Sequence, residues 1–301
     1  MRLRLLAVLA AGILVLAACG DDDTDTDDAT DTTAAATDDG GDDVAAGTGN
    51  ECTAGNTLVD GVLTPATGDP AFPPYVIDDD PASGQGFEAA VVAAVAEEMG
   101  FSPENINWVR VGFEEAIQPG PKDFDFNIQQ YSITPERAEV VTFSEPYYTS
   151  NQAVVALEDS VAADAVTLED LRGLKFGAQV ATTSLAFAED VIQPDQEVFV
   201  YNDNTAAKAA LDAGQIDAIV LDLPTAFFVS AVEIEGSRVI AQFPAEAGGT
   251  TDQFGMLFEL DNPLADCVNE ALAALTESGE LAEITEEWMS NVTDAPVVEV
   301  G

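Results

Sequence analysis

The chain has 301 residues, with 56 Asp and Glu against 9 Lys and Arg, and a formal net charge of −47 at pH 7. Eleven aspartates lie before Glu51, so 45 acidic and 7 basic residues remain in the rest of the chain. Such acidity excludes nucleic acid and anionic lipid surfaces as partners, because both would be repelled. The absence of His excludes Ser-His-Asp and Cys-His catalysis and most zinc or copper sites, and we predict no metal or cofactor.

The first 18 residues have the pattern of an export signal. Arg2 and Arg4 precede an apolar run, residues 5–18, that is too short for a comfortable membrane span. The run ends in small residues before Cys19, which resembles a bacterial lipoprotein signal. That resemblance implies a lipid on Cys19 as the mature N-terminus, at the outer face of the cell membrane. Ordinary secretion with a chance cysteine is the alternative.

Residues 19–51 are predicted to form a disordered acidic tether. From Gly20 to Asn50 the chain consists almost wholly of Asp, Thr, Ala and Gly, and no apolar residue is larger than Val44. A segment of this kind cannot bury enough apolar surface to offset the entropy lost on ordering. We therefore expect it to hold a folded region away from the membrane.

Strands and helices alternate through the next hundred residues. Residues 62–67, 106–111 and 124–128 are predicted strands. Apolar residues recur every fourth position in 87–99, which predicts an amphipathic helix, and a short helix is predicted at 113–117. This alternation predicts a parallel sheet covered by helices.

A second alternation follows. Its predicted strands are residues 175–178, 197–201 and 216–221, and its predicted helices are 183–191, 205–213 and 224–232. Extended apolar runs at 152–157 and 254–260 flank this set, and helices at 263–278 and 280–289 follow it. Two such sets separated by two extended runs predict two lobes joined by two crossing strands.

These patterns give a domain division. Residues 1–18 are the signal and 19–51 the tether. Lobe 1 comprises residues 52–153 and 254–293, lobe 2 comprises residues 154–253, and residues 294–301 form a tail.

With Cys19 lipidated, Cys52 and Cys267 remain as an even pair in an exported protein. A disulfide between them would join the start of the folded region to a C-terminal helix. Two buried free thiols are the alternative.

Arg137 stands at the opening of a short helix in a chain almost without positive charge. Thr134 has the side chain of an N-cap, and Pro135 fits the first helical position. A cation in the first turn opposes the helix dipole, which indicates a bound anion. The alternative is a surface arginine paired with a nearby carboxylate.

Seven short motifs together resemble the bacterial extracellular solute-binding proteins of family 3, which serve polar amino acid ABC transporters. They are residues 69–75, 86–88, 132–137, 143–148, 177–184, 214–218 and 222–226. The resemblance covers roughly residues 58–289. It implies an α/β, two-lobed periplasmic-binding-protein-like (type II) fold with two crossing hinge strands. It also implies a monomeric, non-enzymatic binding protein that delivers an amino acid to a permease and its ATPase.

The resemblance implies roles for five residues that would bind an amino-acid head group. Arg137 pairs with the α-carboxylate, an arrangement that a guanidinium suits, and Ser132 bonds the same group. Thr182 and Thr183 open a helix whose N–H groups can hold a carboxylate. Asp222 pairs with the α-ammonium. From the residues alone, Thr183 is a good N-cap without any ligand, and Asp222 is either a helix N-cap or a ligand group at a strand's carboxyl end.

The residues predicted to contact the ligand side chain each have an alternative role. Phe72 packs over that side chain by resemblance, but it is equally suited to a core. Asp69 can bind a cationic side chain or fix its own proline-rich loop. Gln130, together with Gln129, departs from the small residues usual in the family, and these amides either reach the ligand or narrow the pocket.

Two further readings remain open. Some exported proteins resembling this fold are dehydratases, which need a catalytic acid such as Glu88, Glu136 or Glu145. An osmolyte or amino-acid derivative is the other alternative. It should keep its carboxylate, because an unpaired buried Arg137 is costly.

Overall fold

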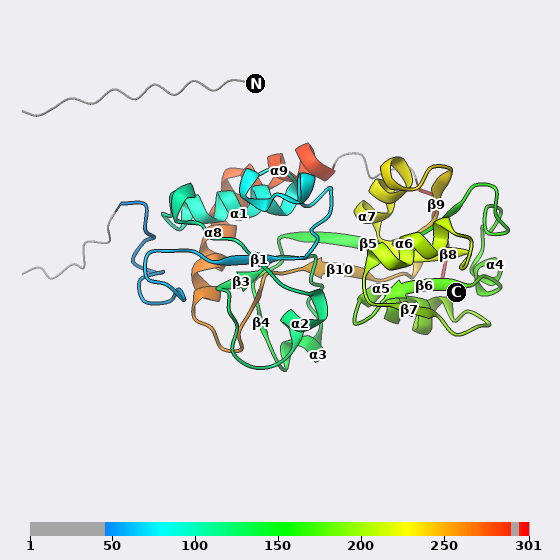
Figure 1. The fold of residues 1–301 in the computed structure, drawn as a ribbon, viewed down its shortest axis with the longest axis horizontal. Helices are drawn as coiled ribbons and strands as arrows, with labels where there is room; N and C mark the ends of the chain where they lie inside the picture. Colours follow the sequence, from blue (N-terminus) through cyan, green and yellow to red (C-terminus); the bar gives the residue numbers. More distant parts are fainter. Residues whose placement is uncertain (1–45, 290–294, 301) are drawn as a thin grey trace, which may run out of the picture. The chain divides into compact units, whose positions relative to one another are not determined.

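The structure, a computed structural model, describes residues 46–289 and 295–300. Lobe 1 is built on a five-stranded sheet with the order β2-β1-β3-β11-β4 (Figure 1). Its strands are β1 (Pro65–Thr67), β2 (Val109–Arg110), β3 (Phe126–Asn127), β4 (Thr142–Phe143) and β11 (Leu257–Phe258). As predicted, β1 is parallel to both β2 and β3, although all three strands are shorter than expected.

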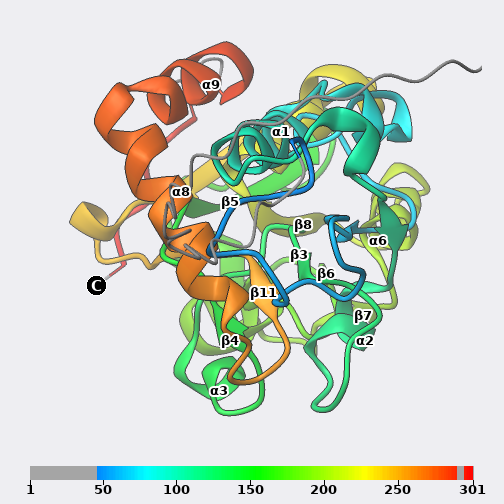
Figure 2. The same ribbon diagram turned by 90° about the vertical axis from the view of Figure 1, so that its left-hand side faces the viewer.

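Helices cover both faces of this sheet. On one face lie α1 (Phe87–Glu98), α8 (Leu264–Ser278) and α9 (Glu280–Met289), which contact one another (Figure 2). Their apolar residues, Val91, Val95 and Leu272 among them, form the main core of the lobe. On the other face lie α2 (Phe113–Ile117) and α3 (Pro135–Ala138) (Figure 1).

Lobe 2 contains a six-stranded sheet in which β10-β5-β8-β6-β7 are neighbours and β9 also pairs with β5. The strands are β5 (Tyr148–Leu157), β6 (Phe176–Gln179), β7 (Phe199–Tyr201), β8 (Ala218–Asp222), β9 (Ser237–Phe243) and β10 (Thr251–Phe254). The helices are α4 (Leu168–Arg172), α5 (Thr183–Phe187), α6 (Asn204–Asp212) and α7 (Leu223–Phe228). Both α5 and α7 continue into a single π-helical turn.

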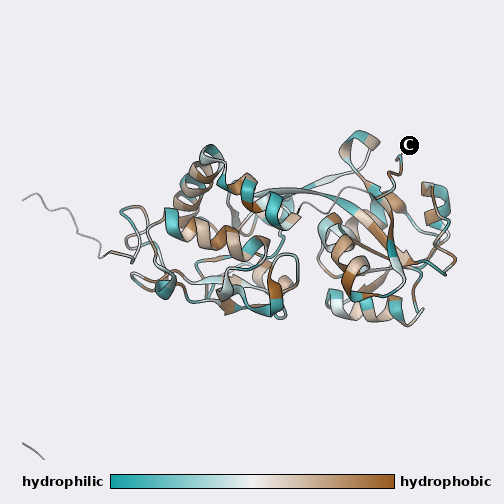
Figure 3. Cartoon of the chain, turned by 90° about the horizontal axis from the view of Figure 1, so that it is seen from above, coloured by the Kyte–Doolittle hydropathy of each residue, from teal (hydrophilic) through white to brown (hydrophobic). Residues whose placement is uncertain are grey.

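The period of two along β5 separates the two cores of lobe 2. Ala153 and Val155 pack with α6 and α7, whereas Val154 and Ala156 pack with α4 and α5. Most helices carry both hydrophobic and hydrophilic residues, as expected where one side faces a sheet (Figure 3). The lobe therefore has a helix–sheet–helix layering like lobe 1.

Two paired strands connect the lobes. β10 runs antiparallel to β5, with Thr251 opposite Asn151 and Phe254 opposite Tyr148 (Figures 1 and 3). Beyond Gly255 and Met256 the chain enters β11, in the sheet of lobe 1. The predicted run at 254–260 is thus two short strands in different sheets, and the predicted two-lobed fold with two crossing strands is confirmed.

The sequence predicts a tail at residues 294–301, but the described part of this segment packs on lobe 2. Met289 packs in the core of lobe 1, whereas Val298 packs in a core of lobe 2 and its N–H donates to the Gln242 carbonyl at 3.0 Å. The chain's end therefore contacts both lobes.

The predicted disulfide between Cys52 and Cys267 is present, and it joins residues 215 positions apart. The predicted signal peptide and Cys19 lie outside the described residues. Within the described part, no helix has the length and apolar character needed to cross a membrane.

Candidate ligand-binding site

One cavity lies between the lobes at the carboxyl ends of strands from both sheets. Thr67 ends β1, Gln179 ends β6 and Asp222 ends β8, and all three residues line the cavity. This is where ligands of α/β sheets gather. The cavity volume is about 720 Å³, including space open to solvent.

Seven of the eight predicted ligand-binding residues line this cavity. They are Arg137, Ser132, Asp222, Thr183, Thr182, Phe72 and Gln130. The structure does not bring Asp69 to them, because its side chain is exposed outside the cavity.

Arg137 is positioned by the short helix α3. As predicted, Thr134 is the N-cap and Pro135 the first helical residue, and the Thr134 hydroxyl accepts from the Arg137 N–H at 3.2 Å. The guanidinium donates to the carbonyl of Ser132 at 2.7 Å and, across the cleft, to that of Ala181 at 2.8 Å. These bonds hold its fork against the cavity.

The Arg137 guanidinium is buried without a counter-ion. Arg137 is 9% exposed, and no carboxylate among the described residues forms an ion pair with its guanidinium. Burial lowers the pKa of the guanidinium from its ordinary value. Two carbonyls engage only part of its five N–H donors. An anion in the cavity would offset this burial, since an unpaired buried charge is costly.

Asp222 is the N-cap of α7 and also lines the cavity. Its carboxylate accepts the Thr225 N–H at 3.0 Å and the Thr225 hydroxyl at 2.7 Å. Tyr75 from lobe 1 donates its hydroxyl to the same carboxylate at 2.5 Å. A carboxylate has about four acceptor positions, so these three bonds leave room for one more donor. Burial raises the pKa of Asp222.

Thr183 contacts the other lobe instead of capping its helix. The N-cap of α5 is Thr182, whose hydroxyl accepts from the Leu185 N–H at 3.1 Å, which corrects our expectation that Thr183 is the cap. The Thr183 hydroxyl lies 3.2 Å from that of Ser132. Residues from both lobes thus meet at the Arg137 end of the cavity.

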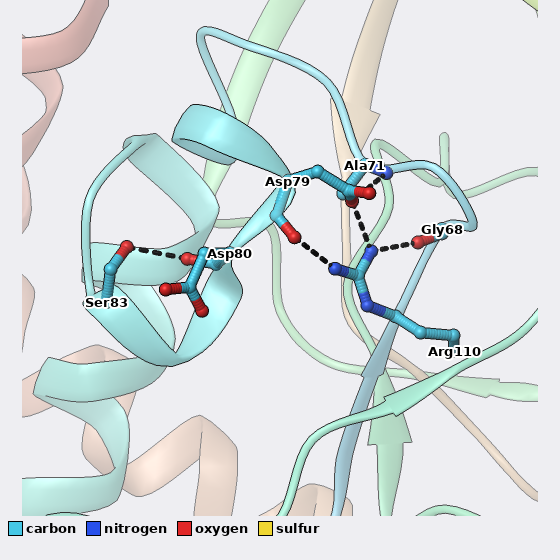
Figure 4. Close-up of polar contacts among 6 residues, drawn as sticks. All are labelled: Gly68, Ala71, Asp79, Asp80, Ser83 and Arg110. Carbon is cyan, nitrogen blue, oxygen red and sulfur yellow. Dashed lines mark hydrogen bonds and ion pairs between the residues drawn. The ribbon is translucent and has the colours of Figure 1, made fainter. Parts of the chain in front are cut away.

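The loop that carries Phe72 is fixed by Arg110 and Asp79 (Figure 4). Arg110 donates to the Gly68 carbonyl at 2.5 Å and to the Asp79 carboxylate at 2.7 Å, and that carboxylate also accepts the Ala71 N–H at 2.9 Å. Phe72 lines the cavity, and the Lys208 ammonium of lobe 2 lies 4.5 Å from its ring centroid.

The two glutamines have different environments. Gln130 adopts a left-handed backbone (φ 53°), and its backbone and side-chain N–H groups both donate to the buried carboxylate of Glu88. Gln129 accepts the Tyr131 hydroxyl at 3.1 Å, while its amide nitrogen has no hydrogen-bond partner among the described residues. Gln129 therefore keeps both of its amide N–H donors for a ligand, whereas Gln130 uses one of its two on Glu88.

Sequence reasoning missed several lining residues, among them Tyr75, Phe113, Gln179 and Asn204. For Gln179 a signal existed, because it ends a parallel strand as Asp222 does. For Tyr75 the informative feature is a hydrogen bond to the other lobe, which no local pattern reveals.

Glu88 accepts the hydrogen bonds that fix Gln130, and its effect on the stability of the fold depends on pH. Burial raises its pKa from 4.5 to about 7, although bonds from Tyr147 and Gln130 act in the opposite direction. The folded state therefore holds a proton between pH 4.5 and 7 that the unfolded state has lost. The contribution of the Glu88 carboxyl to the free energy of unfolding is therefore greatest below pH 4.5 and is lost as the pH rises through 7.

We compare the free energy of unfolding of Glu88→Gln with that of the wild type. As the pH rises from 4 to 8, we expect the difference to shift by about 3 kcal/mol in favour of Glu88→Gln. Urea unfolding followed by tryptophan fluorescence suits this measurement, because Trp108 and Trp288 both pack on the core that contains α1. Glu98→Gln, an exposed substitution on the same helix, is the control. Parallel pH profiles for wild type and Glu88→Gln would contradict the assignment.

Residues 66–291 match the model of the bacterial extracellular solute-binding proteins, family 3. The arginine-binding periplasmic protein of Mannheimia haemolytica is 29% identical over 73% of this chain and 89% of its own length. The glutamate-binding protein GluB of Corynebacterium efficiens is 29% identical over 74% of this chain and 76% of its own length.

A solved structure has the same fold. The arginine-, lysine-, histidine-binding protein ArtJ of Geobacillus stearothermophilus matches with a TM-score of 0.64 and 24% identity, over 76% of this chain and 95% of its own. The names of these relatives differ in the amino acid they bind. Since the family match spans about three quarters of the sequence, the chain belongs to the bacterial extracellular solute-binding proteins, family 3.

Proposed function

We propose that the protein is the substrate-binding component of an ABC transporter and captures a zwitterionic amino acid between its lobes. Arg137 and Ser132 bind the α-carboxylate, and Asp222 binds the α-ammonium. Thr183 and Thr182 support the carboxylate from lobe 2, and Phe72 covers the ligand side chain.

The observation that carries this proposal is the pair of opposite charges on the two lobes, where Arg137 is buried and Asp222 is half-buried. Arg137 lacks a counter-ion among the described residues, and Asp222 retains one free acceptor position. A zwitterion supplies the missing partner to each. Because the two groups belong to different lobes, the ligand stabilises the closed arrangement.

An enzymatic role is less well supported. Glu136 and Glu145 are exposed, and Glu88 does not line the cavity but is engaged by Tyr147 and Gln130. None of these acids faces the space where a substrate would lie. We therefore propose binding without turnover.

Delivery and anchoring complete the proposal. The closed, loaded protein passes its ligand to a permease coupled to an ATPase, as a monomer held at the outer face of the cell membrane by lipid on Cys19. Similarity to amino-acid-binding proteins of ABC transporters supports the delivery step.

The test is a calorimetric titration of the purified protein with the twenty amino acids and with glycine betaine. We expect at least one α-amino acid to bind with a dissociation constant in the micromolar range or tighter. Glycine betaine should bind more weakly, because its quaternary nitrogen has no N–H for Asp222. If no amino acid binds, the proposal is wrong, and tighter binding of betaine would make an osmolyte the ligand.

A further inference from the structure

We propose that the ligand side chain is uncharged and carries a carboxamide, and that Gln179 is the main residue that selects it. This inference rests on the proposed function, because it takes the amino-acid head group as bound by Arg137 and Asp222. It assigns the rest of the cavity to a specific side-chain chemistry, with glutamine as the best ligand.

The first observation is the charge balance of the cavity wall. Among the described residues that line it, Arg137 is the one cation and Asp222 the one anion. An amino-acid head group uses both charges. A cationic or anionic ligand side chain would then be buried without a counter-ion, at a large desolvation cost.

Three carboxylates that adjoin lining residues are not available to a cationic side chain. Glu88 accepts three hydrogen bonds from Gln130 and Tyr147. Asp252 accepts the side-chain amide of Gln152 at 2.5 Å, and Asp69 is exposed. None of the three lines the cavity.

The second observation is a set of side-chain amides with unused hydrogen-bonding groups. Gln179 is 9% exposed and lines the cavity, yet its side chain forms no hydrogen bond with any described residue. Asn204 at the start of α6 lines the same cavity with its amide equally unengaged, and Gln129 adds a free amide nitrogen from lobe 1.

The Gln179 amide faces the cavity without a protein partner, and a ligand that fills the cavity would desolvate it, so a good ligand must offer it hydrogen bonds. An amide offers both donors and an acceptor. A ligand carboxamide also has N–H donors and a carbonyl acceptor, so it can bond both the oxygen and the nitrogen of the Gln179 side chain. A guanidinium or ammonium group only donates, and a carboxylate only accepts.

The matching variant is Gln179→Glu, which keeps the shape and adds the missing anion. Gln179→Ala removes the amide altogether. Gln196 is an exposed glutamine of the same lobe outside this cavity, so Gln196→Glu and Gln196→Ala are matched controls.

The experiment is isothermal titration of the full protein with L-glutamine, L-arginine, L-glutamate and L-norleucine. We expect wild type to bind glutamine about tenfold or more tightly than the other three, equivalent to about 1.4 kcal/mol. Gln179→Ala should lose about that factor for glutamine relative to norleucine. Gln179→Glu should favour arginine over glutamine, and both Gln196 variants should behave as wild type.

The outcomes separate this inference from the proposed function. If wild type binds arginine or glutamate more tightly than glutamine, the inference is overturned while amino-acid binding stands. If Gln179→Ala keeps the full preference for glutamine and its thermal unfolding is unchanged, the role of Gln179 is also overturned. If none of the four ligands and no other amino acid binds, the proposed function itself fails.

Discussion

Arg137→Ala is expected to weaken amino-acid binding by about 100-fold or more, equivalent to about 2.7 kcal/mol. The substitution removes the cation that pairs with the α-carboxylate and leaves the bound carboxylate without a counter-ion. Of the two residues whose carbonyls Arg137 engages, Ser132 lines the cavity and Ala181 is exposed, and neither belongs to a hydrophobic core. The fold should therefore persist, with a similar urea midpoint.

The comparison needs a second arginine that also donates to a backbone carbonyl. Arg238 bonds the Ala163 carbonyl on an exposed surface of lobe 2, so Arg238→Ala is the matched control and should bind as wild type. Arg137→Lys should bind with intermediate affinity, because it keeps the charge but loses the bidentate fork. Unchanged calorimetric affinity for the best amino acid in Arg137→Ala would make the head-group assignment wrong.

Much of the fold follows from local patterns. The period of four in α1 and the alternation of strands and helices were enough to predict two α/β lobes. By contrast, β9 was missed, since five of its seven residues are buried and the strand shows no clean alternation. The docking of Val298 on lobe 2 was missed because it depends on a long-range contact with β9.

The candidate site was predictable where a residue's backbone position determines its role. Arg137 follows a capping pattern, and Asp222 ends a strand, so both were expected at the cavity. Asp69 has a carboxylate that could bind a ligand, but its side chain is exposed. Arg110 and Asp79 hold the adjoining loop. Side-chain direction in that loop depends on these long-range bonds and cannot be derived from its sequence.

Loss of the Cys52–Cys267 bridge is expected to lower the free energy of unfolding of lobe 1 by about 3 to 5 kcal/mol. The bridge closes a loop over a sequence separation of 215 residues, so it removes much entropy from the unfolded chain. Cys267 lies on α8 in the core with α1, and Cys52 packs against the same core. The bridge therefore stabilises the lobe that supplies Arg137 but does not line the cavity.

Comparison of the Cys52→Ala/Cys267→Ala variant with wild type in urea, with and without dithiothreitol, measures this contribution. Tryptophan fluorescence reports on the relevant lobe, because Trp108 and Trp288 are the only tryptophans and both pack on its core. Dithiothreitol should lower the wild-type midpoint to that of the variant and leave the variant unchanged. Ligand affinity should stay within about twofold of wild type under native conditions, because the bridge constrains the unfolded chain and neither cysteine lines the cavity. A wild-type midpoint that does not respond to reduction would show that the bridge contributes nothing to stability.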